Sequence, residues 1–218
     1  GAEAHLLHHR RLAFAQRQPL RNEPVLLNDV VQDIAGIEPT SDLRFRVNRD
    51  VVVLPTAVDT ERYTPVGDDV RGEAIVLGWI GTSANLRYLQ SIETALASVL
   101  SRNTNAVLHV ICDAAPKLQS VEPSRVIFTP WSELNEVRAI QSFTVGLMPL
   151  EDSPWARGKC SFKMLQYMAC GLPVVVSPVG MNAEVLSLGE IGFGAKVPDD
   201  WIGALSLLIS SQDTRRRM

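Results

Sequence analysis

Hydrophobic positions after residue 70 alternate between two patterns, short apolar runs and apolar residues at helical spacing. Residues 74–80 and 106–112 are runs of the first kind. Between them, apolar residues recur every one to four positions along one helical stripe, at Leu89, Ile92, Leu96, Val99 and Leu100. A buried strand, an amphipathic helix and a second buried strand in this order predict a β–α–β unit, which joins parallel strands.

The same alternation continues toward the end of the chain. A further helix is expected between Ser161 and Gly171. Other strands are expected over 125–129, 144–150, 174–176 and 192–197, and other helices over 133–141 and 201–209. Regular alternation of this kind places helices on both faces of a parallel sheet. The predicted fold class is therefore α/β, with a Rossmann-like parallel sheet preceded by a short helical N-terminal segment.

The first fifty residues have a different pattern. Apolar residues at helical spacing, with Pro24 at the start and Gly36 beyond the end, predict an amphipathic helix over 24–34, and residues 3–16 are a candidate for another. Two helices cannot form a second Rossmann-like domain. We expect three regions: a helical segment that is a remnant of another domain or a separate appendage, a connector and an α/β domain, over 1–50, 51–70 and 71–218.

Composition limits the possible functions. The 218 residues, 46% hydrophobic and 21% charged, can bury one full core but not two complete Rossmann-type domains. A net charge of −3 argues against general affinity for nucleic acids, and no apolar run approaches the ~20 residues that cross a bilayer. The three cysteines lack the spacing of a disulfide framework or a zinc site. We therefore expect a reducing, cytoplasmic location.

Histidines and arginines gather in the N-terminal segment. His5 and His9 share a helical face, as metal ligands can, but no cluster of cysteines or carboxylates completes a ligand shell. Four arginines between residues 10 and 21 make the segment basic. A solvated helix is the favoured interpretation of both features, and peripheral contact with the inner face of a membrane is the alternative for the arginines.

The most informative segment is 159–180. Ser161 is a candidate cap for a helix that ends at Gly171, and a buried strand follows. The first turn of a helix has unpaired N–H groups and a partial positive charge. With Lys159 and Lys163 beside it, this helix start suits an anion such as a diphosphate. An ordinary helix–strand unit of a parallel sheet is the alternative.

Four motifs point to one family. Residues 166–175 read Gln-Tyr-Met-Ala-Cys-Gly-Leu-Pro-Val-Val, and they follow three other motifs in order, at 53–65, 77–82 and 145–150. Together these motifs resemble the C-terminal, donor-binding domain of retaining GT-B glycosyltransferases of the glycosyltransferase family 4 type. The resemblance covers the chain from about residue 50 to its C-terminus.

The resemblance implies a function for each region. Residues 71–218 would bind a nucleotide-diphosphate sugar, and residues 1–50 would be a remnant of the acceptor domain. The implied reaction is glycosyl transfer with retention to an unknown acceptor, in polysaccharide or glycoconjugate biosynthesis, within a cleft between two domains. Neither a cofactor nor an obligatory metal is expected.

Compared position by position, the chain departs from the family at several charged residues. The family places one Glu against the ribose of the sugar donor, where this chain has Gln166, and another against the sugar, where it has Gly158. The family also commonly has an Arg after the first strand's glycine turn. Thr82 stands there, and Arg87 is the nearest base downstream.

Lys159 and Lys163 are therefore the candidates for the missing phosphate-binding charge. Trp155 is favoured as a ring that stacks on a base or a sugar, whereas packing is favoured for Trp131. Small residues after the first strand let backbone approach a substrate. The predicted donor-binding residues are Gly81, Thr82, Ser83, Arg87, Trp155, Lys159, Ser161, Phe162, Lys163, Gln166, Gly180 and Asn182. The sequence assigns no catalytic residue.

Three other functions are alternatives. A non-catalytic nucleotide-sugar-binding scaffold is the main one, because both family glutamates are replaced and the first domain is curtailed. A GT-B nucleotide-sugar epimerase would share the sheet and the phosphate site, but it needs acid and base groups at the sugar that the sequence does not show. A nicotinamide dehydrogenase is disfavoured, because no Gly-x-Gly-x-x-Gly follows a strand.

Overall fold

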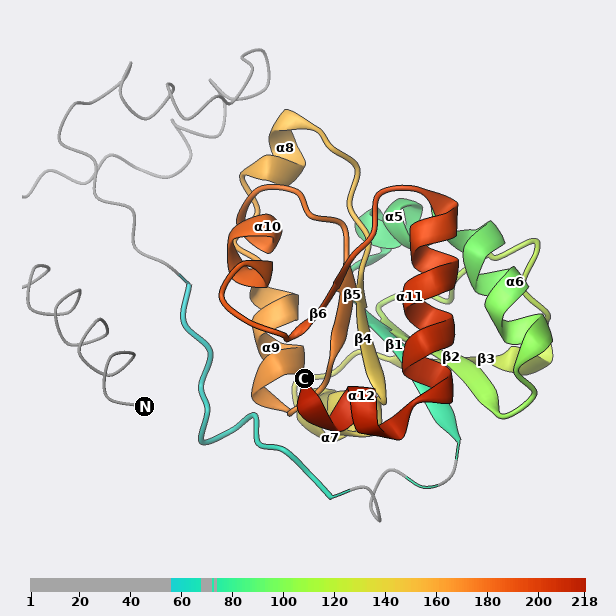
Figure 1. Ribbon diagram of the computed structural model, residues 1–218, viewed down its shortest axis with the longest axis horizontal. Coiled ribbons are helices and arrows are strands. Elements are labelled where there is room, and N and C mark those ends of the chain that lie inside the picture. Colours follow the sequence, from blue (N-terminus) through green and yellow to red (C-terminus); the bar gives the residue numbers. More distant parts are fainter. Residues whose placement is uncertain (1–55, 68–71, 73) are drawn as a thin grey trace, which may run out of the picture. The chain divides into compact units, whose positions relative to one another are not determined.

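The computed structural model describes residues 56–67, 72 and 74–218 (Figure 1). The helices predicted over 3–16 and 24–34, the histidine pair and the basic segment lie outside the described residues. The boundaries of the three regions stay a prediction.

A six-stranded sheet forms the centre of the described chain, and all of its strand pairs are parallel. The strand order is β3-β2-β1-β4-β5-β6. The strands are β1 Ile75–Ile80, β2 Ala106–Cys112, β3 Val126–Pro130, β4 Val145–Met148, β5 Val174–Val176 and β6 Gly192–Gly194. The predicted Rossmann-like parallel sheet is confirmed, and each expected strand is present.

Helices cover both faces of this sheet, as Figure 1 shows for α6 and α11 on one side and α9 and α10 on the other. The first face carries α5 Leu86–Gln90, α6 Glu93–Arg102 and α11 Pro198–Ser210. The second face carries α7 Glu136–Gln141, α9 Phe162–Ala169 and α10 Met181–Leu186. Successive side chains of a strand point to opposite faces, so Leu77 belongs to the first core cluster and Val76 to the second.

The sequence did not predict several short helices. These are α8 Pro154–Arg157, α10, α12 Gln212–Arg217 and two 3-10 turns, η2 Ser83–Asn85 and η3 Pro123–Arg125. The single helix expected around residues 89–100 is divided into α5 and α6. In α7 the first turn expected from residue 133 is absent, because residues 132–135 form a hydrogen-bonded turn instead.

Tyr167 fixes α9 against the centre of the sheet. Its ring lies over Gly146 of β4, where a Cβ atom would come within 2.4 Å of the ring. Its hydroxyl donates to the carbonyl of Leu147 at 3.2 Å and accepts from the N–H of Ile80 at 3.1 Å. The second half of α9 is therefore held against β1 and β4.

The described part of the connector, residues 56–67, packs along α7. The guanidinium of Arg62 donates to the carbonyl of Glu133 at 3.1 Å, and the Gln141 amide donates to the carbonyl of Thr64 at 2.9 Å. Tyr63 lies between these contacts and is buried. These contacts attach the connector to the element that follows β3.

Candidate functional site

The strand order reverses between β1 and β4, because the chain leaves these neighbours toward opposite edges of the sheet. In open parallel sheets, ligands bind in the crevice outside the carboxyl ends of the strands at this reversal. Residues 81–85 follow β1 and residues 149–161 follow β4. The ammonium of Lys159 spans the two segments, donating to Oδ1 of Asn85 at 2.9 Å.

Two cations lie over one buried aromatic ring at this crevice. The Lys159 ammonium and the Arg87 guanidinium are each 4.8 Å from the ring centroid of Tyr88, which is a cation–π distance. Arg87 also donates to the Tyr88 hydroxyl at 3.0 Å. Together with Lys163, these residues form what we call the cation cluster.

The cations of this cluster disfavour one another. Burial lowers the pKa of Lys159 below its usual range, and the positive charges of Lys163 and Arg87 lower it further. Burial also lowers the pKa of Lys163, against the opposing effects of Cys160 and Glu136. An anion bound here would relieve this repulsion, so the electrostatics favour a ligand with negative charge.

The loop after β1 forms one wall of the crevice. The N–H of Gly81 continues the sheet by donating to the carbonyl of Ile111 at 3.0 Å. The Thr82 hydroxyl accepts from the Asn85 amide at 2.9 Å, next to Lys159. Ser83 instead faces the end of β2, because its N–H and hydroxyl both donate to the carboxylate of Asp113. Those bonds hold the pKa of Asp113 below its usual range.

Ser161 occupies the predicted N-cap position of α9, but its side chain makes no capping hydrogen bond, so that part of the prediction is wrong. Its backbone is left-handed, with φ 55°, and its buried hydroxyl donates to Oδ1 of Asn182 at 2.6 Å. Asn182 is itself buried and donates to the carbonyl of Ser177 at 3.1 Å. Asn182 thus links the start of α9 to the end of β5. Because Ser161 does not use them, the first N–H groups of α9 can serve an anion.

The segment between β4 and α9 carries exposed aromatic side chains. Trp155, on α8, is 61% exposed, and Phe162, the first residue of α9, is 39% exposed. Gly180 lets the loop after β5 pass beside α8. Its φ is 55°, and a Cβ atom there would lie 2.5 Å from the carbonyl oxygen of Arg157. Trp155 and Phe162 thus present exposed rings in and next to the segment that carries Lys159, and Gly180 packs against that segment at Arg157.

Gln166 is buried and belongs to a group of polar side chains around Glu136, a residue that the sequence did not single out. Its buried amide donates to Oε1 of Glu136 at 2.6 Å and to the Tyr63 hydroxyl at 2.7 Å. The Tyr63 hydroxyl and the indole N–H of Trp131 also donate to the Glu136 carboxylate. We call these four residues the carboxylate cluster.

Two residues of the carboxylate cluster differ from expectation. Packing was favoured for Trp131, but this residue is 48% exposed. The prediction of a packed ring is therefore wrong. Nothing in the sequence marked Glu136 as a functional residue, because an acidic residue in the first turn of a helix is common. Only its contacts with Tyr63 and Gln166 distinguish it from a surface residue.

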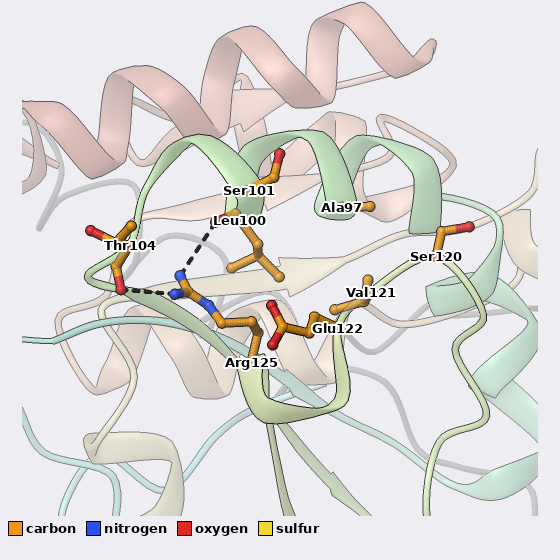
Figure 2. Close-up of a pocket in the computed structure, with 8 residues that line it drawn as sticks. All are labelled: Ala97, Leu100, Ser101, Thr104, Ser120, Val121, Glu122 and Arg125. Atoms are coloured by element: carbon orange, nitrogen blue, oxygen red, sulfur yellow. Dashed lines mark hydrogen bonds between the residues drawn. The ribbon is translucent and has the colours of Figure 1, made fainter.

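A pocket of about 220 Å³ lies elsewhere, at the end of α6 (Figure 2). Arg125 reaches into it and donates to the carbonyls of Thr104 at 2.9 Å and Leu100 at 3.3 Å. A cation that binds the last carbonyls of a helix is a C-terminal cap. This pocket is near the amino end of β2, whereas the cation cluster is at the carboxyl end of β1.

Within residues 56–67, 72 and 74–218, no three His, Cys, Asp or Glu side chains gather closely enough to hold a metal ion. In the same residues, no helix has the length and apolar character needed to span a bilayer.

Comparisons with solved structures agree on the fold. The C-terminal domain of the glycosyl transferase group 1 family protein LpcC from Francisella tularensis aligns with a TM-score of 0.58 and 17% identity, over 73% of this chain and 91% of that one. AviGT4, a glycosyltransferase involved in avilamycin A biosynthesis, aligns with a TM-score of 0.53 and 19% identity, over 78% of this chain and 52% of AviGT4. The described sheet and helices have the fold of a GT-B C-terminal domain, and the chain spans about half of AviGT4.

Other comparisons are weaker or negative. A putative UDP-N-acetylglucosamine 2-epimerase from Listeria monocytogenes aligns with a TM-score of only 0.45 and 12% identity, over 69% of this chain and 40% of that one, and this likeness carries no argument. No curated protein matches the chain.

The family assignment comes from the sequence itself. The family model described as "Glycosyl transferases group 1" matches residues 74–211, which is well over half of the chain and includes the whole sheet, the cation cluster, and Trp131, Glu136 and Gln166 of the carboxylate cluster. The chain therefore belongs to the group 1 glycosyl transferases.

Proposed function

We propose that this chain is the donor-binding part of a retaining glycosyltransferase that uses a nucleotide-diphosphate sugar. The observation that carries the proposal is the contact between Lys159 and Asn85, which brings a cation across the β1–β4 crevice. Arg87 and Lys163 add positive charge around it. Family membership supplies the class of reaction, and the cation cluster supplies a place for the diphosphate.

The proposed chemistry is electrostatic. When the bond between sugar and diphosphate breaks, negative charge grows on the departing phosphate oxygens. Lys159, Lys163 and the first N–H groups of α9 would stabilise that charge more strongly in the transition state than in the bound substrate. The side chains thus offer the charge that a metal ion supplies in other enzymes, and no obligatory metal is part of the proposal.

The acceptor side of the reaction belongs to another part of the enzyme. Because the chain spans about half of AviGT4, we infer that acceptor-binding and catalytic groups lie outside residues 71–218. The described domain should then bind nucleotide by itself and transfer sugar slowly or not at all. Robust transfer by the purified chain would contradict this division of labour.

Calorimetric titration with UDP, GDP and ADP tests the proposal. Selective binding of one diphosphate by the wild-type chain, weakened at least about tenfold by Lys159→Ala, is the expected result. Arg102→Ala is the matched control, because Arg102 is an exposed cation at the end of α6, outside the cation cluster. Absence of binding to all three nucleotides would contradict the proposal.

A further inference from the structure

Three segments of the chain direct hydrogen-bond donors at the Glu136 carboxylate. The Tyr63 hydroxyl comes from the connector, the Trp131 indole N–H from the loop after β3, and the Gln166 amide from α9. Tyr63 and Gln166 are buried, whereas Glu136 is only partly buried. One side of the carboxylate is therefore held inside the protein, and another side remains open to solvent.

The acceptor positions of Glu136 can be accounted for. An ionised carboxylate has two oxygens with about four lone-pair sites. Oε1 accepts from Tyr63 and Gln166, and Oε2 accepts from Trp131. Among the described residues, these three donors leave one lone-pair site, on the oxygen that faces the half-exposed Trp131. That site can accept one more hydrogen bond, from a ligand hydroxyl.

The carboxylate cluster is continuous with the cation cluster. Lys163 lies close enough to Glu136 for their charges to interact, and it also lies close to Lys159. At the sheet edge, the N–H of Trp131 donates to the carbonyl of Cys112, one strand away from the turn at Gly81. Since β3 is two strands from β1, their carboxyl ends are separated by about 10 Å. That span is comparable with the distance from a diphosphate to the base of the same nucleotide.

We propose that Glu136 binds one ribose hydroxyl of the sugar-nucleotide donor, with the Trp131 ring beside the base. This inference rests on the proposed function and refines it. In dinucleotide-binding sheets a carboxylate is the usual partner of a ribose hydroxyl, because an ionised acid accepts the hydrogen bond that the hydroxyl donates. In this chain the acid stands on α7 rather than at position 166 of α9, and the Gln166 amide orients it.

Ribose recognition separates this role from a purely structural one. We would titrate the wild-type chain with the diphosphate that binds and with its 2′,3′-dideoxy analogue. The wild type should prefer the ribose form by about tenfold or more, the typical contribution of a hydrogen bond to a charged group. In Glu136→Gln this preference should fall close to one, since the amide presents a changed acceptor pattern and no charge.

Two controls accompany the variant. Inorganic pyrophosphate probes the cation cluster alone, and Glu136→Gln should bind it at least as well as the wild type, which also shows that the variant folds. Glu133→Gln changes an exposed acid that pairs with Arg62 at 3.7 Å, and it should keep the full preference for ribose.

The outcomes separate the two proposals. A wild-type chain that binds neither nucleotide nor pyrophosphate would overturn the proposed function. A chain that binds nucleotide through Lys159 but treats the ribose and dideoxy forms alike would overturn the role of Glu136 alone. The same conclusion would follow if Glu136→Gln retained the wild-type preference for ribose.

Discussion

The cation cluster and the carboxylate cluster lie along the same edge of the sheet, and each contains a buried tyrosine. Around Tyr88, two cations approach the same aromatic ring and repel each other. Around Glu136, by contrast, the Tyr63 hydroxyl and two other donors satisfy a single carboxylate. The cation cluster therefore has an excess of positive charge, whereas in the carboxylate cluster most acceptor positions of the carboxylate are already occupied by donors of the protein.

This difference indicates that the cation cluster contributes mainly to ligand binding and that the carboxylate cluster contributes to the stability of the free protein. A cluster of like charges is held together by the rest of the fold and gains free energy when an anion arrives. A carboxylate with several internal donors stabilises the free protein, because each buried donor would otherwise lack a partner. Removing a cation from the first cluster should therefore harm mainly the ligand complex, whereas removing Glu136 from the second should harm the free protein as well as the contact with ribose.

The largest expected effect comes from Lys159→Met, which keeps an apolar chain over Tyr88 but removes the charge. Affinity for the nucleoside diphosphate should fall about tenfold to a hundredfold, as for a lost charged hydrogen bond. Without ligand, the free energy of unfolding should change by less than about 1 kcal/mol, because the lost bond to Asn85 is offset by relief of burial and repulsion. Titration calorimetry and urea unfolding measure the two quantities.

A stable variant with unchanged affinity would show that the diphosphate binds away from Lys159. If the variant kept its affinity per folded molecule but had a markedly lower free energy of unfolding, Lys159 would contribute to stability and not to ligand binding. The contrast between the two clusters would then be wrong.

Glu136→Ala should have the opposite profile. It removes the acceptor of the Gln166 amide and the Tyr63 hydroxyl, both buried, so the free energy of unfolding should fall by about 2 kcal/mol. Affinity for pyrophosphate should persist, because the cation cluster is intact. Glu133→Ala is the matched control and should cost less than about 1 kcal/mol, since its pair with Arg62 is exposed. Equal losses in the two variants would show that Glu136 is an ordinary surface acid.

The same contrast explains what could be predicted from the sequence. The strands were predictable because a parallel sheet covered on both faces requires continuous apolar runs. The cation cluster was partly predictable, because Lys159 and Lys163 flank a helix start within five residues of sequence. Short helices such as α8 could not be predicted, because four residues are too few to show a helical period.

The carboxylate cluster could not be predicted, because its meaning depends on residues distant in sequence. Gln166 is 30 positions from Glu136, and Tyr63 is 73 positions from it. The capping role expected of Ser161 failed for a similar reason, since Asn182, 21 positions away, takes its hydroxyl. Local patterns predicted elements and helix-end charges, but not side-chain pairs that only the folded sheet brings together.

The smallest expected effect concerns Tyr63→Phe, and it depends on pH. Burial, followed by the hydrogen bond to Glu136, raises the pKa of Tyr63 from 10.0 to about 12. The folded protein therefore favours the protonated phenol, and its contribution to stability is complete below pH 10 and is lost as the pH rises from 10 through 12. At pH 9 the variant should unfold about 1 kcal/mol more easily than the wild type, as for one lost hydrogen bond.

Near pH 11 this gap should close, because the unfolded wild type then gains by releasing the proton of Tyr63 while the variant has no proton to release. Tyr167, whose pKa burial also raises, is present in both proteins, so its effect cancels in the difference. Urea unfolding at the two pH values measures the gap. A gap that stays constant would mean that Tyr63 contributes by packing alone, and the carboxylate cluster would then have one internal donor fewer than the geometry indicates.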